Sequence, residues 1–290
     1  MVLESLTDPL RAEKQPGLLI LIGLVITCIG IALARGIFPQ YASIVYVFFV
    51  VMASIPLMFN IIKLEEKKDI SDFHETALLK EHGKALKAFM ALFLGIVLGT
   101  VIWYVAAPSG VVGDTFTSQT ATLNQINGRV TGLAAEEAVH TRSDFNIFTK
   151  IFFNNVRVLI FCIVFSFIYG AGAIFILTWN ASVIGVAIGN YMRNNFAQAA
   201  QLIGFDQIAA YLSTATIGLL KYAIHGIPEI LAYFIAGLAG GIISIAVIRH
   251  DFKGKKFEHI ILDTSDLLLL SLVVLLFSAV LEVWVTPLVF

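Results

Sequence analysis

The sequence predicts an all-α fold, a polytopic transmembrane helical bundle with about seven spans. The mean hydropathy is +0.88, and 58% of the 290 residues are apolar. Only 13% are charged, whereas a soluble domain carries roughly a quarter. The apolar residues gather in long runs, and about 20 such residues in succession can cross the hydrocarbon core of a bilayer. We therefore expect an integral, multi-pass membrane protein.

Six apolar runs have the length of a membrane span. In chain order they are Gly17–Ala34, Tyr41–Ile62, Ala88–Ala107, Phe152–Trp179, Pro228–Ile248 and Leu267–Phe290. Because such runs recur along the whole chain, the first is expected to be a span and not a removable signal peptide. A seventh crossing is expected between Asn180 and Ile224, where the apolar sequence is interrupted.

The interrupted stretch holds two apolar pieces, Asn180–Met192 and Gln207–Ile224, with Arg193-Asn194-Asn195 directly after the first. Either one piece is a re-entrant half-helix, or the two pieces together form one broken crossing. Irregular backbone is tolerated at membrane depth only inside protein or beside a wet cavity. We therefore expect a broken or re-entrant region between Asn180 and Glu229, in the interior of the bundle.

Basic residues are unevenly distributed among the connecting segments. Two segments are rich in them, one with Lys63, Lys67, Lys68, Lys80, Lys84 and Lys87 and the other with Arg249, Lys253, Lys255 and Lys256. The longer loop 108–146 has only Arg129 and Arg142. Cytoplasmic loops carry the excess of lysine and arginine. We therefore expect a plasma-membrane protein with loop 108–146 outside, a cytoplasmic N-terminus and an external C-terminus.

The chain divides into two expected parts. Residues 1–87 hold the first two spans and a charged cytoplasmic segment, and residues 88–290 form a five-span core with the outer loop 108–146. The charged segment Lys63–Lys87 has the apolar periodicity of a helix. It is either a helical hairpin that extends the second and third spans, or a surface on which a partner docks.

Three pairs of glycine residues are spaced by four positions within the spans. They are Gly95 and Gly99, Gly185 and Gly189, and Gly237 and Gly241. Glycines at this spacing share one helix face and let helix backbones approach each other closely in lipid. We expect them to pack helices within the chain, and a homo-oligomer interface is the alternative.

Several polar side chains lie within the spans, where they are costly and usually face the protein interior. We predict that they form one polar cluster, which consists of Asn155, Arg157, Asn180, Lys221, His225, Glu229 and Glu282. The expected topology places most of them in the outer half of the membrane.

The sequence His225-Gly226-Ile227-Pro228-Glu229 predicts a helix break within this cluster. Gly226 can end one helix, and Pro228 suits the first turn of the next. Glu229 would then lie where the helix dipole favours its charge. With such a break, His225 and Glu229 would not share a helix face, which argues against a pair of metal ligands.

Two interpretations of the cluster stay open. Glu229 forms a buried ion pair with Arg157 or Lys221, or the cluster is a proton or ion site, since transporters place such sites at half-helix ends. The sequence has no H-E-x-x-H run. We therefore predict no catalytic residue, no metal ligand set and no cofactor.

The second part of the chain carries a series of motifs. In order they are Phe148-x-x-x-Phe152-x-x-Asn155, the glycines Gly170 and Gly172, Asn180 with Gly185, His225-Gly226-x-x-Glu229, and Gly237-x-x-Gly240. Over about Ala88–Phe290 the chain resembles the stage II sporulation protein M family, and the first two spans look like an addition to its five-span core. One departure is Asn180-Ala181, where the family often has Asn-Gly. The resemblance implies a membrane scaffold, which in spore formers holds peptidoglycan-degrading partners at the engulfing septal membrane.

These observations favour a non-enzymatic protein that organises partner proteins or the membrane. Its expected partners are the lipid bilayer and other membrane or envelope proteins, and the formal charge of −1 argues against nucleic acid. The alternative is a transporter or channel with a site for an ion, a proton or a small solute around His225 and Glu229. A third hypothesis is an intramembrane hydrolase. A dry, packed cluster would favour the scaffold, and a wet cavity beside a titratable group would favour the transporter.

Overall fold

The computed structural model describes residues 9–70, 75–125, 144–169, 172–201, 205–248 and 255–289. Within them all regular structure is helical, which confirms the predicted all-α class. The long helices are α2 (Pro16–Ile37), α3 (Ala42–Ile70), α4 (Glu75–Ala106), α7 (Asp144–Tyr169), α8 (Ala173–Ala199), α9 (Phe205–Ile248) and α10 (Lys255–Val280). The short ones are α1 (Pro9–Lys14), the 3-10 turn η1 (Pro39–Tyr41), α5 (Ser109–Thr115), the π-helical turn η2 (Leu281–Val285) and α11 (Thr286–Val289).

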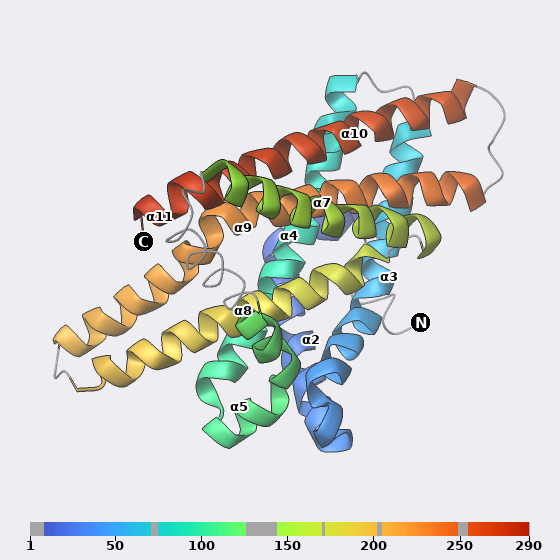
Figure 1. Ribbon diagram of the computed structural model, residues 1–290. Coiled ribbons are helices and arrows are strands. Elements are labelled where there is room, and N and C mark those ends of the chain that lie inside the picture. The colour runs from blue at the N-terminus through green and yellow to red at the C-terminus, as the bar shows by residue number, and fades with distance from the viewer. Residues whose placement is uncertain are drawn as a thin grey trace.

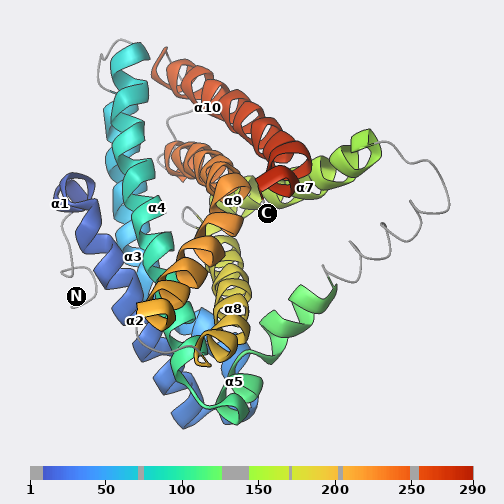
Figure 2. The same ribbon diagram turned by 90° about the vertical axis from the view of Figure 1, so that its left-hand side faces the viewer.

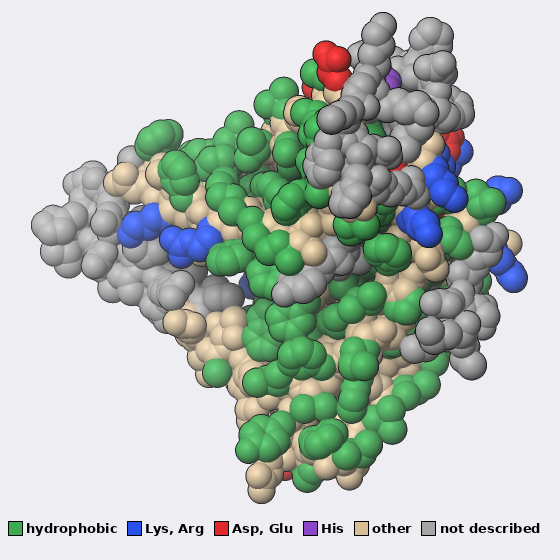
Figure 3. Space-filling model, turned by 90° about the vertical axis from the view of Figure 1, so that its right-hand side faces the viewer, with side chains coloured by type: hydrophobic (Ala, Val, Ile, Leu, Met, Phe, Trp, Pro, Cys, Tyr) green, Lys and Arg blue, Asp and Glu red, His purple; other side chains and the backbone are tan. Residues whose placement is uncertain are grey.

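Seven helices of the described chain are long and apolar enough to cross a membrane. This confirms the prediction of a multi-pass membrane protein with about seven spans. Figure 3 shows that apolar side chains cover most of one face of the molecule, while Lys and Arg gather at its edges. Such a surface suits a lipid environment, because only apolar side chains are favourable against the hydrocarbon core.

The long helices form two groups that run in different directions (Figure 1). Helices α2, α3 and α4 pack on one another, and α7 and α10 pack on the second half of α9. Helix α8 connects the groups, because it contacts α3 and α4 as well as α9. In the turned view of Figure 2, α7 and the end of α10 lie on the side away from α2.

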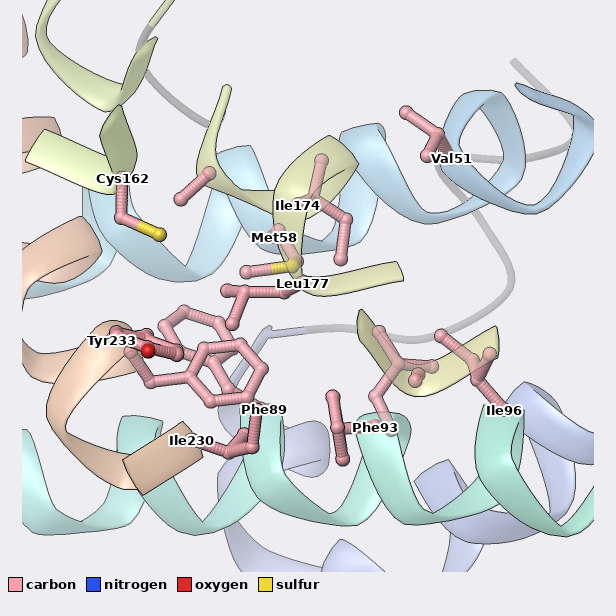
Figure 4. Packing of buried hydrophobic residues seen from close by; sticks show 14 of the residues in the cluster. Val51, Met58, Phe89, Phe93, Ile96, Cys162, Ile174, Leu177, Ile230 and Tyr233 are labelled. Atoms are coloured by element: carbon pink, nitrogen blue, oxygen red, sulfur yellow. The ribbon is translucent and has the colours of Figure 1, made fainter. Parts of the chain in front are cut away.

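The second half of α9 lies at the centre of the core. Ala232, Tyr233, Ala236 and Ile242 have no exposed surface, and the neighbouring Phe234 stacks on an aromatic ring of α4 with ring centroids 5.6 Å apart. Figure 4 shows side chains from α3, α4, α7, α8 and α9 in this one cluster. Close packing of this kind is what holds helices together in lipid, where burial alone gives little driving force.

Glycines bring α2 and α4 into backbone contact. A Cβ atom at Gly95 would lie 2.2 Å from the carbonyl oxygen of Ile20, and one at Gly23 would lie 2.5 Å from the carbonyl oxygen of Leu92. Both distances are shorter than real Cβ contacts, so any side chain at either position would push the two helices apart.

The other glycines of the predicted pairs are also buried between helices of this chain. Gly99 faces Thr27, Gly185 faces Thr100, Gly189 faces Tyr104 and Gly237 faces Ala173, each with less than 3.0 Å for a Cβ atom. Gly241 is buried in the core half of α9. These contacts join helices within one chain.

The fourth and fifth spans differ from the prediction. The run Phe152–Trp179 is predicted as a single span, but α7 ends at Tyr169 and α8 begins at Ala173. The run therefore contains the end of one span and the start of the next. In the sequence, Gly170 and Gly172 lie at this boundary, and glycine is the residue that most often follows a helix end.

Helix α8 also continues through the polar residues that were expected to interrupt it. Arg193 lies in this stretch, and its guanidinium donates hydrogen bonds to the carbonyl oxygens of Tyr104 at 3.0 Å and Ala107 at 2.8 Å. These carbonyls belong to the end of α4, where the helix dipole favours a positive charge. The arginine therefore stabilises the contact of α8 with α4 and does not end α8.

The predicted interruption near residue 226 is a bend within one helix. Helix α9 runs from Phe205 to Ile248 with Pro228 in its interior, and Figure 1 shows its two halves running in different directions. Proline removes one helical hydrogen bond and displaces a carbonyl of the preceding turn, so helices bend there. Helix α9 therefore does not end at Gly226, and Pro228 does not begin a new helix. At 44 residues the helix is about 66 Å long, roughly twice the thickness of the hydrocarbon core.

The charged segment Lys63–Lys87 is a helical hairpin, because α3 extends to Ile70 and α4 begins at Glu75. One of its acidic side chains, that of Glu65, takes part in a buried network. Glu65 is fully buried and accepts hydrogen bonds from Nζ of Lys68 at 2.6 Å and from Nδ1 of His82 at 2.7 Å.

The same lysine reaches the N-terminal helix. Nζ of Lys68 donates to Oε2 of Glu13 at 3.0 Å, which ties α1 to α3. We refer to Glu13, Glu65, Lys68 and His82 as the Glu65 network. It closes the end of the bundle at which α1, α3 and α4 meet.

Candidate functional site

The candidate site lies at the bend of α9. We define the bend site as Glu229, His225 and Tyr233 of α9 together with Glu282 and Thr286 near the C-terminal end of the chain. The hydroxyl of Tyr233 donates to Oε1 of Glu229 at 2.8 Å. Nδ1 of His225 lies 3.3 Å from the hydroxyl oxygen of Thr286. Because α9 is continuous here, His225, Glu229 and Tyr233 share one face, contrary to the expectation from a break.

The C-terminal helix holds α9 at the bend. Pro228 has no N–H group, so one carbonyl of the preceding turn loses its usual helical donor. Next to it, the carbonyl oxygen of His225 accepts a hydrogen bond from the hydroxyl of Ser278 on α10 at 2.7 Å. The bend is therefore fixed from outside by a polar side chain of a neighbouring helix.

Glu282 lies in the π-helical turn Leu281–Val285. Single π-helical turns are rare and often occur at functional sites. Glu282 and Thr286 are four positions apart on one helix face. Thr286 lies 3.3 Å from His225, and this turn packs on α9, which places Glu282 on the side of the bend site. Within the described chain, neither the carboxyl group of Glu282 nor that of Glu229 is in an ion pair. Two neighbouring carboxyl groups without a cation are unfavourable unless a proton or a bound cation separates them.

The structure contradicts the predicted ion pair between Glu229 and Arg157. The buried face of α7 is marked by Asn155, Leu159 and Cys162, whereas Arg157 is exposed. Arg157 therefore points away from α9, because residues two positions apart on a helix do not face the same way.

The alternative pair of Glu229 with Lys221 does not form either. Nζ of Lys221 lies 5.9 Å from the centre of the Tyr191 ring, an arrangement typical of a cation–π contact. Lys221 is therefore directed toward α8, where it interacts with an aromatic ring and not with a carboxylate.

Asn155 and Asn180 lie in different places. Asn155 is buried on α7 with 6% exposure, and its Nδ2 has no hydrogen-bond partner. Asn180 lies on α8, where its Nδ2 donates to the carbonyl oxygen of Ile176 at 2.9 Å. Of the seven residues predicted as one cluster, the structure brings His225, Glu229, Glu282 and Asn180 together. Arg157 and Lys221 are directed elsewhere, and Asn155 lies on the buried face of α7.

A cavity of about 290 Å³ opens beside this face of α9. It lies between α8, α9, the end of α4 and helical residues 117–125. Its polar lining residues are Tyr104, Thr120, Asn124, Asn180, Asn190, Tyr222, His225 and Glu229. None of the described lining residues is Lys or Arg, and Glu229 is the one with a carboxyl group. A polar cavity of this size has room for water or for a small solute.

The geometry at Thr286 does not support a hydrolase. A histidine beside a hydroxyl can mark an activated nucleophile, in which the histidine accepts the hydroxyl proton. Here the hydroxyl of Thr286 donates to the carbonyl oxygen of Leu281 at 3.1 Å. Nδ1 of His225 is then the donor in its contact with Thr286, so the hydroxyl is not activated.

Sequence reasoning missed several residues of this site. Tyr222, Tyr233, Asn190, Ser278 and Thr286 were not singled out, although a signal for three of them was available. Ser278, Glu282 and Thr286 follow one another at intervals of four in an apolar span, so they share a helix face. Tyr233 follows Glu229 at the same interval. A search for polar residues at helical spacing would have found both stripes.

Comparison with known proteins identifies the family of the chain. No curated protein and no solved structure matches the chain. The family model described as stage II sporulation protein M matches residues 20–287. The match therefore extends past Ala88 toward the N-terminus and takes in most of the first two spans. The chain belongs to the stage II sporulation protein M family.

Proposed function

We propose that this protein is a membrane transporter or channel, and that the cavity at the bend site binds a cation, a proton or a small polar solute. The observation that carries the proposal is the cavity of about 290 Å³ that reaches His225 and Glu229. A scaffold whose polar residues serve only stability would be expected to have a dry, packed cluster at this position.

Two further features support a binding site. The cavity lies at a bend within a membrane helix, and transporters commonly place their sites where membrane helices are discontinuous. In addition, Glu229 and Glu282 are neighbouring carboxyl groups without a cationic partner in the described residues. A cation bound in the cavity beside Glu229 would offset the negative charge of this region.

The test is thermal stability in detergent, measured with and without candidate ions between about pH 5 and 8. For the wild type we expect an increase in melting temperature with at least one cation. Glu229→Gln keeps the size of the side chain and should abolish that increase. Glu258→Gln is the matched control, because Glu258 is an exposed glutamate on α10. An equal ion response in Glu229→Gln and the wild type would overturn the proposal.

A second candidate is the scaffold role that the family resemblance implies, in which the protein is non-enzymatic and organises partners. It is favoured by the exposed lysines on the hairpin of α3 and α4, namely Lys63, Lys67, Lys84 and Lys87. Of the described acids nearby, Glu65 is buried in the Glu65 network and Glu81 pairs with Lys84. Lys63, Lys67 and Lys87 then give this surface a basic character that suits an acidic partner. In our proposed topology this surface is cytoplasmic. A photoreactive residue placed at Gly83, where the space around the Cβ position is open, tests it by cross-linking in native membranes. Loss of a defined adduct when all four lysines are changed to glutamine is the expected result.

A further inference from the structure

We propose that the ligand of the cavity is an amphiphile with an amine-bearing head group, and that its hydrocarbon chain lies in an apolar groove beside the cavity. This inference rests on the proposed function and narrows it to one class of ligand. It is carried by the position of the groove, by its connection to the cavity and by the charge of the cavity wall.

The groove is a second hollow, of about 400 Å³, between α4, α8 and α9. Apart from the hydroxyl of Tyr222, its lining side chains are apolar. Leu94 and Ile227 at its edge are 42% and 54% exposed, so the groove opens on the outer surface of the bundle. In a membrane this surface faces lipid, and a hydrocarbon chain can enter from there.

The groove and the cavity meet at the bend. They share the lining residues Ile184 of α8 and Tyr222, Gly226 and Ile230 of α9. Gly226 has no side chain, and no atom of another part of the molecule lies within 4 Å of the place where its Cβ would be. There is therefore open space at the point where the two hollows adjoin. A single molecule can occupy both, with its polar end on the side of His225 and Glu229.

The charge of the wall selects the head group. An anionic head group such as a phosphate would lie beside the carboxyl group of Glu229, and the described cavity wall offers it no Lys or Arg. An ammonium group would instead form a charge-assisted hydrogen bond with Glu229. The neighbouring amide groups of Asn124, Asn180 and Asn190 can accept the remaining hydrogen bonds of the ammonium group. The wall therefore favours an amine.

The test uses the full chain in phosphatidylcholine nanodiscs and three probes: dodecylamine, propylamine and dodecanoate. We expect dodecylamine to raise the melting temperature at concentrations at least tenfold lower than propylamine, because the chain adds contacts in the groove. Dodecanoate should have no saturable effect. Glu229→Gln should remove the response to dodecylamine.

A second variant tests the connection between the hollows. Gly226→Leu fills the open space at the bend and should weaken the response to dodecylamine at least tenfold. Gly36→Leu is the matched control, because Gly36 is also a helical glycine with open space around it. Leu94→Trp, at a residue that lines the groove and not the cavity, should weaken the response to dodecylamine as well while leaving the response to propylamine in place. If Gly226→Leu does not fold, Leu94→Trp still narrows the groove from its edge, and Leu33→Trp on α2 is its control at similar exposure.

The outcomes separate the two proposals. If propylamine and dodecylamine act at equal concentrations and both require Glu229, the amphiphile inference is overturned and the proposed function stands. If dodecanoate and dodecylamine act alike and neither requires Glu229, the groove holds bulk lipid only, which also overturns the inference. If no amine or ion has a Glu229-dependent effect, both proposals fall.

Discussion

The molecule has two clusters that place glutamate and histidine together, and their electrostatic environments are opposite. In the Glu65 network, a fully buried glutamate lies between Lys68 at 2.6 Å and His82 at 2.7 Å. At the bend site, Glu229 accepts a hydrogen bond from the hydroxyl of Tyr233 at 2.8 Å, and within the described residues no cation forms an ion pair with it. The first cluster contains its own cations, and the described part of the second does not.

This difference separates a structural cluster from a candidate site. A buried carboxylate is tolerated when paired groups of the protein compensate its lost hydration. The Glu65 network meets this condition and has no need of a ligand. The bend site does not meet it, and it lies beside a polar cavity. The lost hydration of these carboxyl groups is then most simply compensated by a proton or by a cationic ligand that the protein binds.

The largest expected effect comes from removing the charge of the structural cluster. Glu65→Gln replaces one carboxylate oxygen by an amide NH₂ group, which then faces a donor from Lys68 or His82. Breaking a buried ion pair in this way typically costs ~3–5 kcal/mol, so we expect a loss of about 3 kcal/mol in the free energy of unfolding. Denaturant unfolding of the purified protein in detergent measures it.

The same substitution at the bend site sharpens the comparison. Glu229→Gln keeps an acceptor for Tyr233 and removes the repulsion with Glu282. We therefore expect the free energy of unfolding without ligand to lie within ~1 kcal/mol of the wild-type value. A small stabilisation and no change both agree with this expectation. A loss as large as that of Glu65→Gln would mean that Glu229 is also a structural residue, and the contrast between the clusters would disappear.

The sequence predicted the fold class and the seven spans well, because these depend on local apolar runs whose length is set by the bilayer. It predicted the course of α8 poorly. Arg193 was interpreted as an interruption because its partners, the carbonyls of Tyr104 and Ala107, are almost 90 positions away in the chain. A long-range contact of this kind leaves no local signal.

The candidate site was predicted in part for a similar reason. Pro228 and Gly226 correctly marked an unusual place in α9, but whether such a pair ends or bends a helix depends on the neighbours that support it. Here Ser278 of α10 supports the bend. Arg157 was assigned to the cluster by its depth in the membrane. The depth of a residue in the membrane does not determine on which side of α7 its side chain lies. That side follows from the helical position of the residue relative to the buried Asn155 and Leu159.

An effect between those of Glu65→Gln and Glu229→Gln is expected from the hydrogen bond that Tyr233 donates to Glu229. Tyr233→Phe keeps the buried ring and removes the hydroxyl that donates to Oε1 of Glu229 at 2.8 Å. Loss of a buried hydrogen bond to a carboxyl group costs about 1.5 kcal/mol, and unfolding in detergent measures it. The double variant with Glu229→Gln should lose less than the sum of the two single changes, because the two groups interact directly. If the loss in the double variant equals the sum of the two single losses, the hydrogen bond between Tyr233 and Glu229 is not the cause of the effect.

The last prediction concerns the rim of the structural cluster, and it is a pH dependence. Burial beside Glu65 raises the pKa of Glu13 to about 7, although Lys68 opposes the shift. The ordinary pKa of this carboxyl group is 4.5, so between these two values the folded protein binds more protons than the unfolded chain. Stability then falls as the pH rises through this window. Melting temperatures measured from about pH 4.5 to 8 should show this fall in the wild type and a smaller one in Glu13→Gln. Lys14→Gln, on the same helix but outside the Glu65 network, should keep the full dependence. An unchanged slope in Glu13→Gln would show that another group titrates in this range, and the Glu65 network would then be less completely compensated than its geometry implies.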